Sequence, residues 1–322
     1  GMAVASLAVG AYSIFKIKKE NKPENIPVMG VMGAFVFATQ MVNFTIPGTG
    51  SSGHLCGGLL LSALIGPYGG FLSMMAILLL QCLLFADGGL MAYGCNVWNM
   101  AFYACFFGYF CIYKPILGKN PSKKKILIAS ILGSVLSLQL GAFSVTLETL
   151  ISGVTELPFL TFLSFMQPIH LAIGFVEGLI TSAVLIFVYN TRPEMLNLNE
   201  KSNEFSFKKV IAILSIVTVL IGGGISLLAS SSPDGLEWSM ENVAGSTELD
   251  SKGSAYDKAS EIQEKTTLLP DYSISNSNNE ILGTSFSGVL GSVLVAVILI
   301  GGSLIFRFYK KGAKNEQIRK SA

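Results

Sequence analysis

Charged side chains are scarce in this sequence of 322 residues, of which only 13% are Asp, Glu, Lys or Arg while 51% are hydrophobic. A soluble domain carries about 25% charged residues, so the composition excludes an ordinary soluble protein. Several apolar runs approach or exceed the roughly 18 residues that indicate a bilayer-spanning helix. The sequence therefore predicts an all-α, polytopic membrane helical bundle with the lipid bilayer as its surroundings.

Two chemical motifs are also missing from the chain. There is no G-x-x-x-x-G-K-[ST] loop, so the chain cannot use ATP through such a loop and any ATPase must be a partner. None of the five cysteines lies in a C-x-x-C motif, and all of them lie in or beside apolar runs. We therefore interpret the cysteines as small core residues rather than as metal ligands or disulfides.

The charges that are present are segregated along the chain. Basic residues form four clusters: Lys16, Lys18, Lys19 and Lys22; Lys114, Lys119, Lys123, Lys124 and Lys125; Arg192, Lys201, Lys208 and Lys209; and Arg307, Lys310, Lys311 and Lys314. Because each cluster abuts an apolar run, the cytoplasmic border of a membrane is favoured over a nucleic-acid-binding patch. We therefore predict no nucleic-acid partner.

Nine apolar segments fit this charge pattern as membrane spans. Their approximate ranges are 1–15, 27–47, 54–66, 67–86, 95–117, 125–151, 160–189, 209–230 and 283–309. If the N-terminus lies outside, the first, fifth, seventh and ninth spans each end at a basic cluster inside. This places the C-terminus in the cytoplasm and indicates a multi-pass membrane protein.

Three parts of the chain follow from the span pattern and from a shift in composition after residue 190. They are a seven-span core of residues 1–195, a cytoplasmic linker of residues 196–208, and a module of two additional transmembrane helices in residues 209–322. The loop over residues 231–282 is acidic and rich in Ser and Asn. We expect this loop to be external and weakly ordered.

Two of the predicted spans are too short to cross a bilayer. Residues 1–15 give about 22 Å of helix, whereas the hydrocarbon core is about 30 Å thick, so we expect residues to be missing upstream. The span 54–66 reaches only about 20 Å. The loop before it, GTGSSGHLCGG (residues 48–58), must therefore fold inward, where irregular backbone survives only inside protein or beside a watery cavity.

Histidine is the rarest titratable residue, and one of the two histidines, His54, lies in this inward-folded loop. A neutral imidazole binds transition metals, and ionisable residues within a membrane are functional candidates. His54 is therefore a candidate metal ligand. The other, His170, follows Pro168 and shares a helix face with Glu177. That pair is either a hydrogen-bonded structural pair or part of the support of a site.

Three further polar residues are predicted in the outer half of the bundle. Asn96 and Asn99 begin the fifth span, and Glu148 lies near the outer end of the sixth. A polar outer cavity explains their placement most simply, with these residues and His170 supporting the ligand. Asp87, in FADGG, is interpreted as a turn or capping residue.

Other functions remain open on these residues alone. The sequence GSSG (residues 50–53) satisfies the G-x-S-G context of rhomboid intramembrane serine proteases, with Ser52 as nucleophile and His170 as its base. Such a pattern is weak evidence in a chain with 34 glycines. A third class, a membrane scaffold that transports nothing, predicts no metal phenotype.

Several separated segments resemble one known family. These are PVMGVMGAFVFATQMVNFTIPGTGSSGHLCGGLLLSALIGPYGG, FADGG, GCNVWNMAFY and PIHLAIGFVEGLITS, and the resemblance as a whole covers about residues 5–195. They resemble the CbiM/NikM family, the substrate-binding (S) components of energy-coupling-factor transporters for cobalt and nickel. The segment SSPDGLEWS (231–239) resembles the PDGLE module of the two-span, NikN-like partner, here fused in one chain, which favours nickel over cobalt.

The resemblance implies a function and a set of partners. The chain would not be an enzyme and would hold no permanent cofactor. It would capture Ni²⁺ (or Co²⁺) outside the cell for ATP-driven uptake. A transmembrane coupling (T) protein and cytoplasmic ATPase subunits would power that uptake as part of an ABC transporter complex.

The resemblance also implies a metal site made of nitrogen ligands. These are the free N-terminal amine, the amide and imidazole of a histidine at position two, and the histidine of the S-G-H loop, which corresponds to His54. A tetragonal, nitrogen-rich site suits nickel. The sequence begins Gly1-Met2-Ala3 and departs from that pattern. Only His54 can therefore be assigned as a ligand, and we expect the others upstream.

Overall fold

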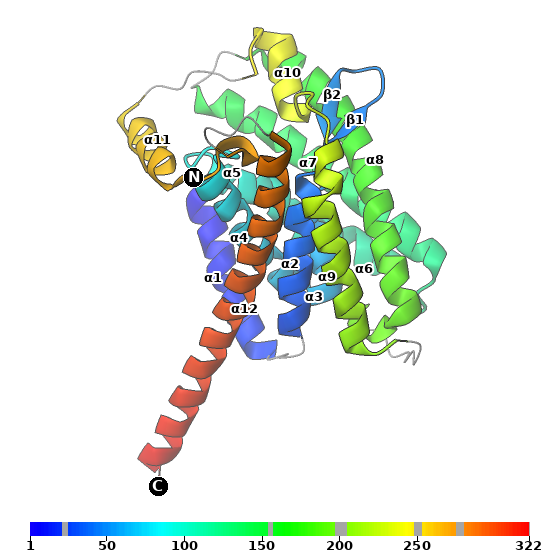
Figure 1. The fold of residues 1–322 in the computed structure, drawn as a ribbon, viewed down its shortest axis with the longest axis vertical. Helices are drawn as coiled ribbons and strands as arrows, with labels where there is room; N and C mark the ends of the chain where they lie inside the picture. The colour runs from blue at the N-terminus through cyan, green and yellow to red at the C-terminus, as the bar shows by residue number, and fades with distance from the viewer. Residues whose placement is uncertain (21–24, 154–156, 197–204, 248–252, 275–279, 322) are drawn as a thin grey trace.

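The computed structural model describes residues 1–20, 25–153, 157–196, 205–247, 253–274 and 280–321, which form a helical bundle with a β-hairpin (Figure 1). Up to residue 196 the elements are α1 (Met2–Glu20), α2 (Asn25–Gln40), β1 (Phe44–Ile46), β2 (Ser51–Gly53), α3 (Gly58–Ile65), α4 (Pro67–Phe85), α5 (Tyr93–Asn96), η1 (Val97–Tyr113), α6 (Lys114–Leu117), α7 (Lys123–Ser152), α8 (Phe159–Thr191) and η2 (Pro193–Leu196). They continue with α9 (Phe207–Gly223), η3 (Ile225–Leu228), α10 (Gly235–Ala244), α11 (Ser254–Thr266), η4 (Pro270–Tyr272) and α12 (Glu280–Ser321).

The chain is a mostly helical, multi-pass membrane protein, as the sequence predicts. In the described part of the chain, 6 helices are long and apolar enough to cross a bilayer: 67–85, 93–117, 123–152, 159–191, 207–228 and 282–305. The predicted count of seven spans plus two is therefore not confirmed. The difference lies in α1, α2 and α3.

The first three helices differ from the predicted spans for distinct physical reasons. Helix α1 continues past residue 15 to Glu20. Lysine favours helix, and the lysines near the helix end can reach water on their long aliphatic stems. Helix α2 ends at Gln40, and the residues after it lead into the hairpin. Helix α3 has only 8 residues, all of them buried. The segment predicted as the span 54–66 is thus a loop followed by a short helix enclosed by protein.

Helices α7 and α8 form the wall on which the rest of the core is built. Glycines of α8 let the two helices approach closely: a Cβ on Gly174 would lie 2.9 Å from the Cα of Val135, and one on Gly178 would lie 2.5 Å from the Cα of Ile131. Small residues allow such close backbone packing between membrane helices. Helix α8 runs from the hairpin end of the bundle to its opposite end (Figure 1).

The two C-terminal spans pack against the core. Helix α12 lies along α2, where a Cβ on Gly30 would meet the side chain of Ile300 at 2.5 Å. Helix α9 contacts both α2 and α12. The hydrophobic core is continuous across this boundary, since Leu214 and Leu299 belong to the same buried cluster as Phe37 of α2.

The expectation that residues 231–282 are weakly ordered is wrong for the described part of that segment, which contains α10, α11 and η4. Helix α10 begins with a capping box: Asp234 accepts hydrogen bonds from the backbone N–H groups of Leu236 (2.8 Å) and Glu237 (2.9 Å), and Glu237 accepts one from Asp234 (3.1 Å). Capping satisfies backbone donors at a helix start. The low hydrophobicity of the loop concealed this local signal.

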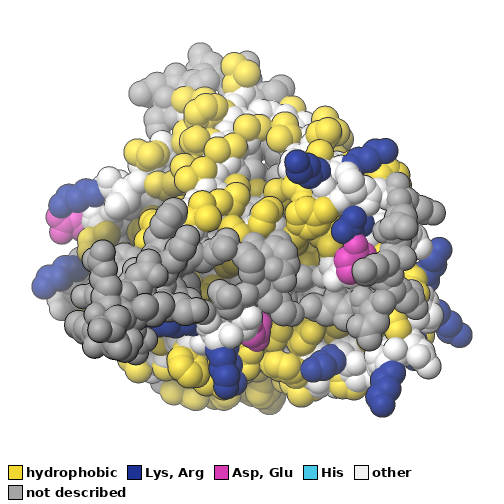
Figure 2. All heavy atoms as spheres, turned by 90° about the horizontal axis from the view of Figure 1, so that it is seen from below, with side chains coloured by type: hydrophobic (Ala, Val, Ile, Leu, Met, Phe, Trp, Pro, Cys, Tyr) yellow, Lys and Arg dark blue, Asp and Glu magenta, His cyan; other side chains and the backbone are white. Residues whose placement is uncertain are grey.

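The end of the bundle opposite the hairpin carries basic side chains, and we call it the basic face. Figure 2 shows this end with dark-blue Lys and Arg side chains spread around it and few acidic ones. Exposed lysines at the helix ends here include Lys18, Lys19, Lys119, Lys123, Lys124, Lys208 and Lys209. The end that carries the hairpin is called the hairpin face.

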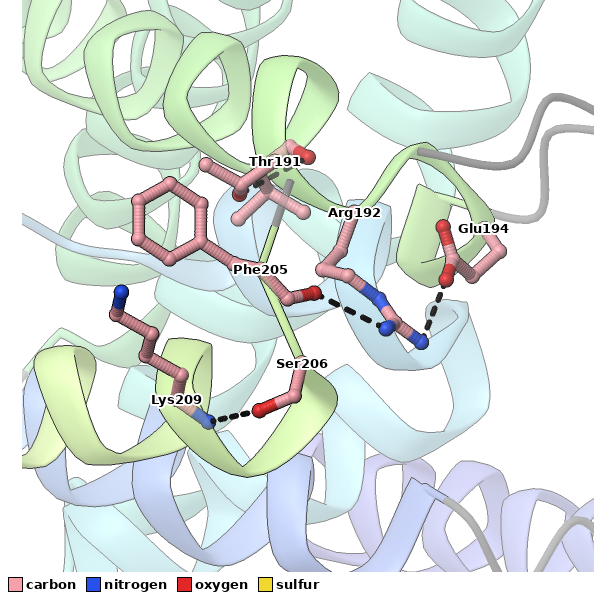
Figure 3. Close-up of polar contacts among 7 residues, drawn as sticks. Thr191, Arg192, Glu194, Phe205, Ser206 and Lys209 are labelled. Carbon is pink, nitrogen blue, oxygen red and sulfur yellow. Dashed lines mark hydrogen bonds and ion pairs between the residues drawn. The ribbon is translucent and has the colours of Figure 1, made fainter. Parts of the chain in front are cut away.

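Arg192 joins the two parts of the chain at the basic face (Figure 3). Its Nη1 donates to the backbone oxygen of Phe205 at 3.2 Å, and its Nη2 pairs with the carboxylate of Glu194 at 2.5 Å. Helix α9 starts beside it, where the hydroxyl of Ser206 accepts the backbone N–H of Lys209 at 3.3 Å. Most of the predicted linker, residues 197–204, lies outside the described residues.

Candidate functional site

The loop that carries His54 is built on a small hairpin. Strands β1 and β2 pair antiparallel with Thr45 opposite Ser52. The turn between them uses Gly48 (φ 79°) and Gly50 (φ 78°), a backbone region that glycine adopts without steric cost. After β2 the chain turns inward to α3. This arrangement agrees with the predicted inward-folded loop, although the hairpin itself was not predicted.

A cavity of about 150 Å³ lies beneath the hairpin, between η1, α7 and α8. Both histidines line it, His54 from the loop and His170 from α8, together with Asn96 and Asn99. The other lining residues are mostly apolar or small: Gly53, Cys56, Met100, Ala104, Ser137, Leu138, Gly141, Ala142, Val145, Met166, Ile173, Asp234, Gly235 and Leu236. The structure thus brings together four of the polar residues that the sequence singled out.

The two imidazoles have similar local hydrogen bonds. The Nδ1 atom of His54 lies 3.1 Å from the backbone oxygen of Leu55, and the Nδ1 atom of His170 lies 2.8 Å from that of Met166. A carbonyl oxygen only accepts, so Nδ1 is the donor in each contact, and in a neutral imidazole the lone pair is then on Nε2. That is the form of histidine that binds a metal through Nε2.

Glu148 reaches the site through Asn99. The Nδ2 atom of Asn99 donates to Oε2 of Glu148 at 2.8 Å. The remaining oxygens of this pair, Asn99 Oδ1 and Glu148 Oε1, are buried without a hydrogen-bond partner among the described residues. The pair therefore offers two unused acceptors next to the cavity.

The described side chains do not complete a metal site by themselves. Among them, no group of three or more His, Cys, Asp or Glu side chains is placed to hold a metal ion. The start of α1 lies close by: the Ser6 hydroxyl donates to the backbone oxygen of Gly94 at 2.8 Å, and Ala3 packs against the same glycine. Residue 94 belongs to α5, which leads directly to Asn96 of the cavity.

Glu177 does not pair with His170. Its carboxylate instead accepts the backbone N–H groups of Cys56 (3.0 Å) and Gly57 (3.1 Å), at the start of α3. The structural pairing that the shared helix face suggested is therefore wrong. Sequence reasoning missed the contact because it joins residues about 120 positions apart in the chain.

The PDGLE segment forms part of the cavity, which the sequence did not predict. The backbone oxygen of Pro233 accepts the N–H of Ser52 at 2.8 Å, and Nε1 of Trp238 donates to the backbone oxygen of Thr49 at 2.9 Å. Between these anchors Gly235 lies against α8, where a Cβ would stand 3.2 Å from Cε1 of His170. Helix α10 lies beside the hairpin at the same end of the bundle (Figure 1).

A second anchor holds the segment after α11 on the other side of the hairpin face. The Tyr272 hydroxyl donates to the carboxylate of Asp87, so Asp87 accepts a long-range hydrogen bond in addition to its place in a turn. Loss of hydration and the nearby Asp87 carboxylate raise the pKa of Tyr272 above its usual value. The backbone N–H of Leu269 also donates to the backbone oxygen of Leu84 at 3.1 Å.

Ser52 lacks the geometry of a nucleophile. It is fully buried, and its hydroxyl donates to the backbone oxygen of Ser232 at 2.8 Å. His170, the proposed base, bonds through Nδ1 to its own helix. The rhomboid-like alternative is therefore not supported.

The cysteines are free, and three of them, Cys56, Cys82 and Cys105, are buried as expected. Cys111 is exposed, so the interpretation as core residues fails there. The thiol of Cys56 donates to the backbone oxygen of Met100 at 3.1 Å beside the cavity.

Comparisons with known proteins bear on this site. Residues 1–195 match the family profile of CbiM, the cobalt uptake substrate-specific transmembrane region, and residues 208–308 match the PDGLE domain. A protein of Archaeoglobus fulgidus assigned as the fused nickel transport protein NikMN is 32% identical over 295 residues, 92% of this chain and 90% of its own length. A protein of Lactiplantibacillus plantarum assigned as the fused nickel transport protein LarMN is 32% identical over 76% of this chain and 75% of its own length.

Two more similarities concern the N-terminal part of the chain. The cobalt transport protein CbiM of Sorangium cellulosum is 32% identical over 177 residues, 53% of this chain and 76% of its own length. The crystal structure of a truncated transition metal transporter superposes with a TM-score of 0.51 and 30% identity, covering 58% of this chain and 91% of that one.

Proposed function

Since this chain belongs to the CbiM family of cobalt-uptake transmembrane proteins and carries a PDGLE domain in the same polypeptide, we propose that it captures Ni²⁺ or Co²⁺ in the cavity beneath its hairpin. It is a membrane component of nickel or cobalt transport and not an enzyme. The finer proposal is that it acts as the substrate-binding component of an energy-coupling-factor transporter.

The observation that carries this proposal is the meeting of both histidines with the PDGLE segment around one cavity. His54, His170 and Asp234 all line it, although they come from three distant parts of the sequence. The cavity lies at the hairpin face, away from the basic face. Because basic residues concentrate on the cytoplasmic side of membrane proteins, the basic face is inside and the cavity receives metal from outside. The N-terminus is then outside and the C-terminus cytoplasmic.

His54 is the residue that we propose as a direct ligand, through Nε2. His170, Asn96 and Asn99 line the cavity near it, and Glu148 orients Asn99. Further ligands would come from the start of α1, which lies beside α5. Nitrogen ligands in a tetragonal arrangement favour Ni²⁺, as do the names of the two fused relatives.

The PDGLE segment is proposed to roof the metal cavity. The backbone oxygen of Pro233 is bonded to β2 at Ser52, and the Trp238 side chain is bonded to the turn at Thr49. Gly235 packs on α8, so metal cannot enter along this side without displacing the segment. A roof of this kind would exclude water and hold the loop of His54 in its binding position.

Energy for uptake would come from partners. The chain has no P-loop, so we propose a transmembrane coupling protein and cytoplasmic ATPases that dock from the basic face.

Accumulation of radioactive ⁶³Ni²⁺ in cells tests this proposal. The full set of components should accumulate nickel, with competition by Co²⁺, and a P-loop lysine substitution in the ATPase should abolish accumulation. Equal accumulation with and without this chain would contradict the proposal and favour a scaffold.

A further inference from the structure

Glu177 is a fully buried carboxylate at the centre of α8, and the proposed function gives it no role. It is 0% exposed, and both of its oxygens accept backbone N–H groups at the start of α3, from Cys56 and Gly57. Burying a carboxylate is costly unless hydrogen bonds replace its hydration. Two charge-assisted bonds at a helix N-terminus provide that replacement.

The backbone that Glu177 holds is fixed from two sides. Gly57, which precedes α3, has φ 83° and no side chain that could cap the helix, so Glu177 supplies the cap from another helix. The amide Nε2 of Gln40 donates to the backbone oxygen of Cys56 at 2.8 Å. The peptide group between Cys56 and Gly57 is therefore bonded at its oxygen by Gln40 and at its N–H by Glu177.

The next peptide group toward the hairpin connects Glu177 to the imidazole. The N–H of Cys56 donates to Glu177 at 3.0 Å, and the carbonyl of the same peptide group, on Leu55, accepts Nδ1 of His54 at 3.1 Å. A carboxylate pulling on the N–H polarises the peptide and makes its carbonyl a better acceptor. That favours the tautomer with the proton on Nδ1, which leaves Nε2 for a metal.

We propose that Glu177 is a positioning residue for His54, acting through the peptide group between Leu55 and Cys56. It fixes the orientation and the tautomer of the imidazole without touching the metal. His170 lies on the same helix two turns away, so α8 carries both the second histidine of the cavity and the residue that holds the loop of His54. The claim that His54 is positioned for a metal rests on the proposed function. The link from Glu177 to the backbone does not depend on that function.

Glu177→Gln tests the link with little change in volume. The amide oxygen can still accept one N–H, but its NH₂ group meets the other, so at least one bond is lost. Hydrogen–deuterium exchange of the full chain in nanodiscs should show the amides of Cys56 and Gly57 exchanging about tenfold faster than in the wild type. In cells with the complete transporter, the KM for ⁶³Ni²⁺ uptake should rise about tenfold while the maximal rate per folded molecule stays unchanged.

Ser182→Ala is the matched control. Ser182 is buried on the same helix, and among the described residues its hydroxyl bonds within that helix alone, to the backbone oxygen of Leu179 at 2.8 Å. It should behave as the wild type in both measurements. If Ser182→Ala reproduces the effects of Glu177→Gln, the cause is the stability of α8 and the proposal is overturned.

Glu177→Asp keeps the charge on a shorter side chain and covers the case in which the glutamine variant does not fold. It should show smaller changes in the same direction. Wild-type exchange in the variants, or faster exchange with an unchanged KM, overturns the positioning role. Absence of nickel uptake by the wild type would overturn the proposed function and, with it, the claim that Glu177 positions His54 for a metal. The exchange measurement would still decide whether Glu177 fixes the backbone at Cys56 and Gly57.

Discussion

The PDGLE module meets the core in two regions that differ in kind. At the hairpin face the contacts are hydrogen bonds between defined atoms, such as Ser52 N–H to Pro233 oxygen (2.8 Å) and Trp238 Nε1 to Thr49 oxygen (2.9 Å). Within the bundle the contact is packing of α12 on α2, where Gly30 makes room for Ile300. Hydrogen bonds depend on direction and distance, whereas apolar packing has no preferred direction.

This difference assigns separate tasks to the two regions. Packing between membrane helices gives association, and small residues promote it by letting the helices approach closely. The bonds at the hairpin face act on the loop that leads to His54, so they fix geometry where the metal would bind. We therefore expect changes at the hairpin face to affect transport and changes within the bundle to affect stability.

The largest effect should come from His54→Ala, which tests the chemical centre of the hairpin face. We expect ⁶³Ni²⁺ accumulation to fall to the level of cells that lack the chain, because a proposed direct ligand is removed. His170→Ala serves as the comparison and should reduce uptake by about tenfold to a hundredfold, as expected for a residue that supports a ligand. Both need equal amounts of protein in the membrane fraction. Normal uptake by His54→Ala would refute the assigned site.

A pair of glycine substitutions separates the two regions directly. In Gly235→Val the new Cβ would stand 2.9 Å from the side chain of Ile173 and 3.2 Å from that of His170, so the PDGLE segment must move off α8. We expect about tenfold slower nickel uptake, corresponding to about 1.4 kcal/mol, with the protein still folded. Gly30→Ala in the bundle instead pushes on the flexible end of Ile300.

For Gly30→Ala we expect a lower unfolding temperature, since overpacking costs about 1–3 kcal/mol, and near-normal uptake per folded molecule. Thermal unfolding in detergent and uptake in cells measure the two properties separately. If Gly30→Ala slows uptake as much as Gly235→Val does, then the hairpin face does not act on metal-site geometry separately from the helix association within the bundle.

The sequence predicts the parts of this molecule that depend on local pattern. Apolar runs locate the six long helices, and the short run after His54 indicates an inward-folded loop. The parity of the basic clusters predicts that Asn96, Asn99 and His170 lie at the same end of the bundle as His54, and the structure places them around one cavity. Whether they bind a metal stays a prediction.

What the sequence does not predict depends on pairing over long distances. The contact of Glu177 with the start of α3 and that of Ser52 with Pro233 join residues more than a hundred positions apart, which periodicity does not report. The strands of the hairpin have 3 residues each, too few for an alternating pattern. Helix α10 was concealed by polar composition, although the capping residues Asp234 and Glu237 were visible in the PDGLE motif.

A smaller effect should come from Ser52→Ala, which removes the side-chain contacts of Ser52 with Ser232 and Pro233 at the hairpin face and leaves the main-chain bond in place. The hydroxyl of Ser52 donates to the oxygen of Ser232 at 2.8 Å, while its backbone N–H would still donate to Pro233. The loss of one such bond costs about 1 kcal/mol, so nickel uptake should stay within about fivefold of the wild type.

Ser51→Ala is the control for this variant, because the Ser51 hydroxyl donates within its own strand, to the backbone oxygen of Ser52 at 3.1 Å, and lies 3.4 Å from the oxygen of Pro233, at the limit of a hydrogen bond. It should change uptake less than Ser52→Ala does. A fall of Ser52→Ala to the level of His54→Ala would instead mean that the hydroxyl has a chemical role, and the nucleophile hypothesis would need to be reconsidered. A small, graded effect across the two serines would show that the main chain sets the position of the PDGLE segment and that the side chains only strengthen it.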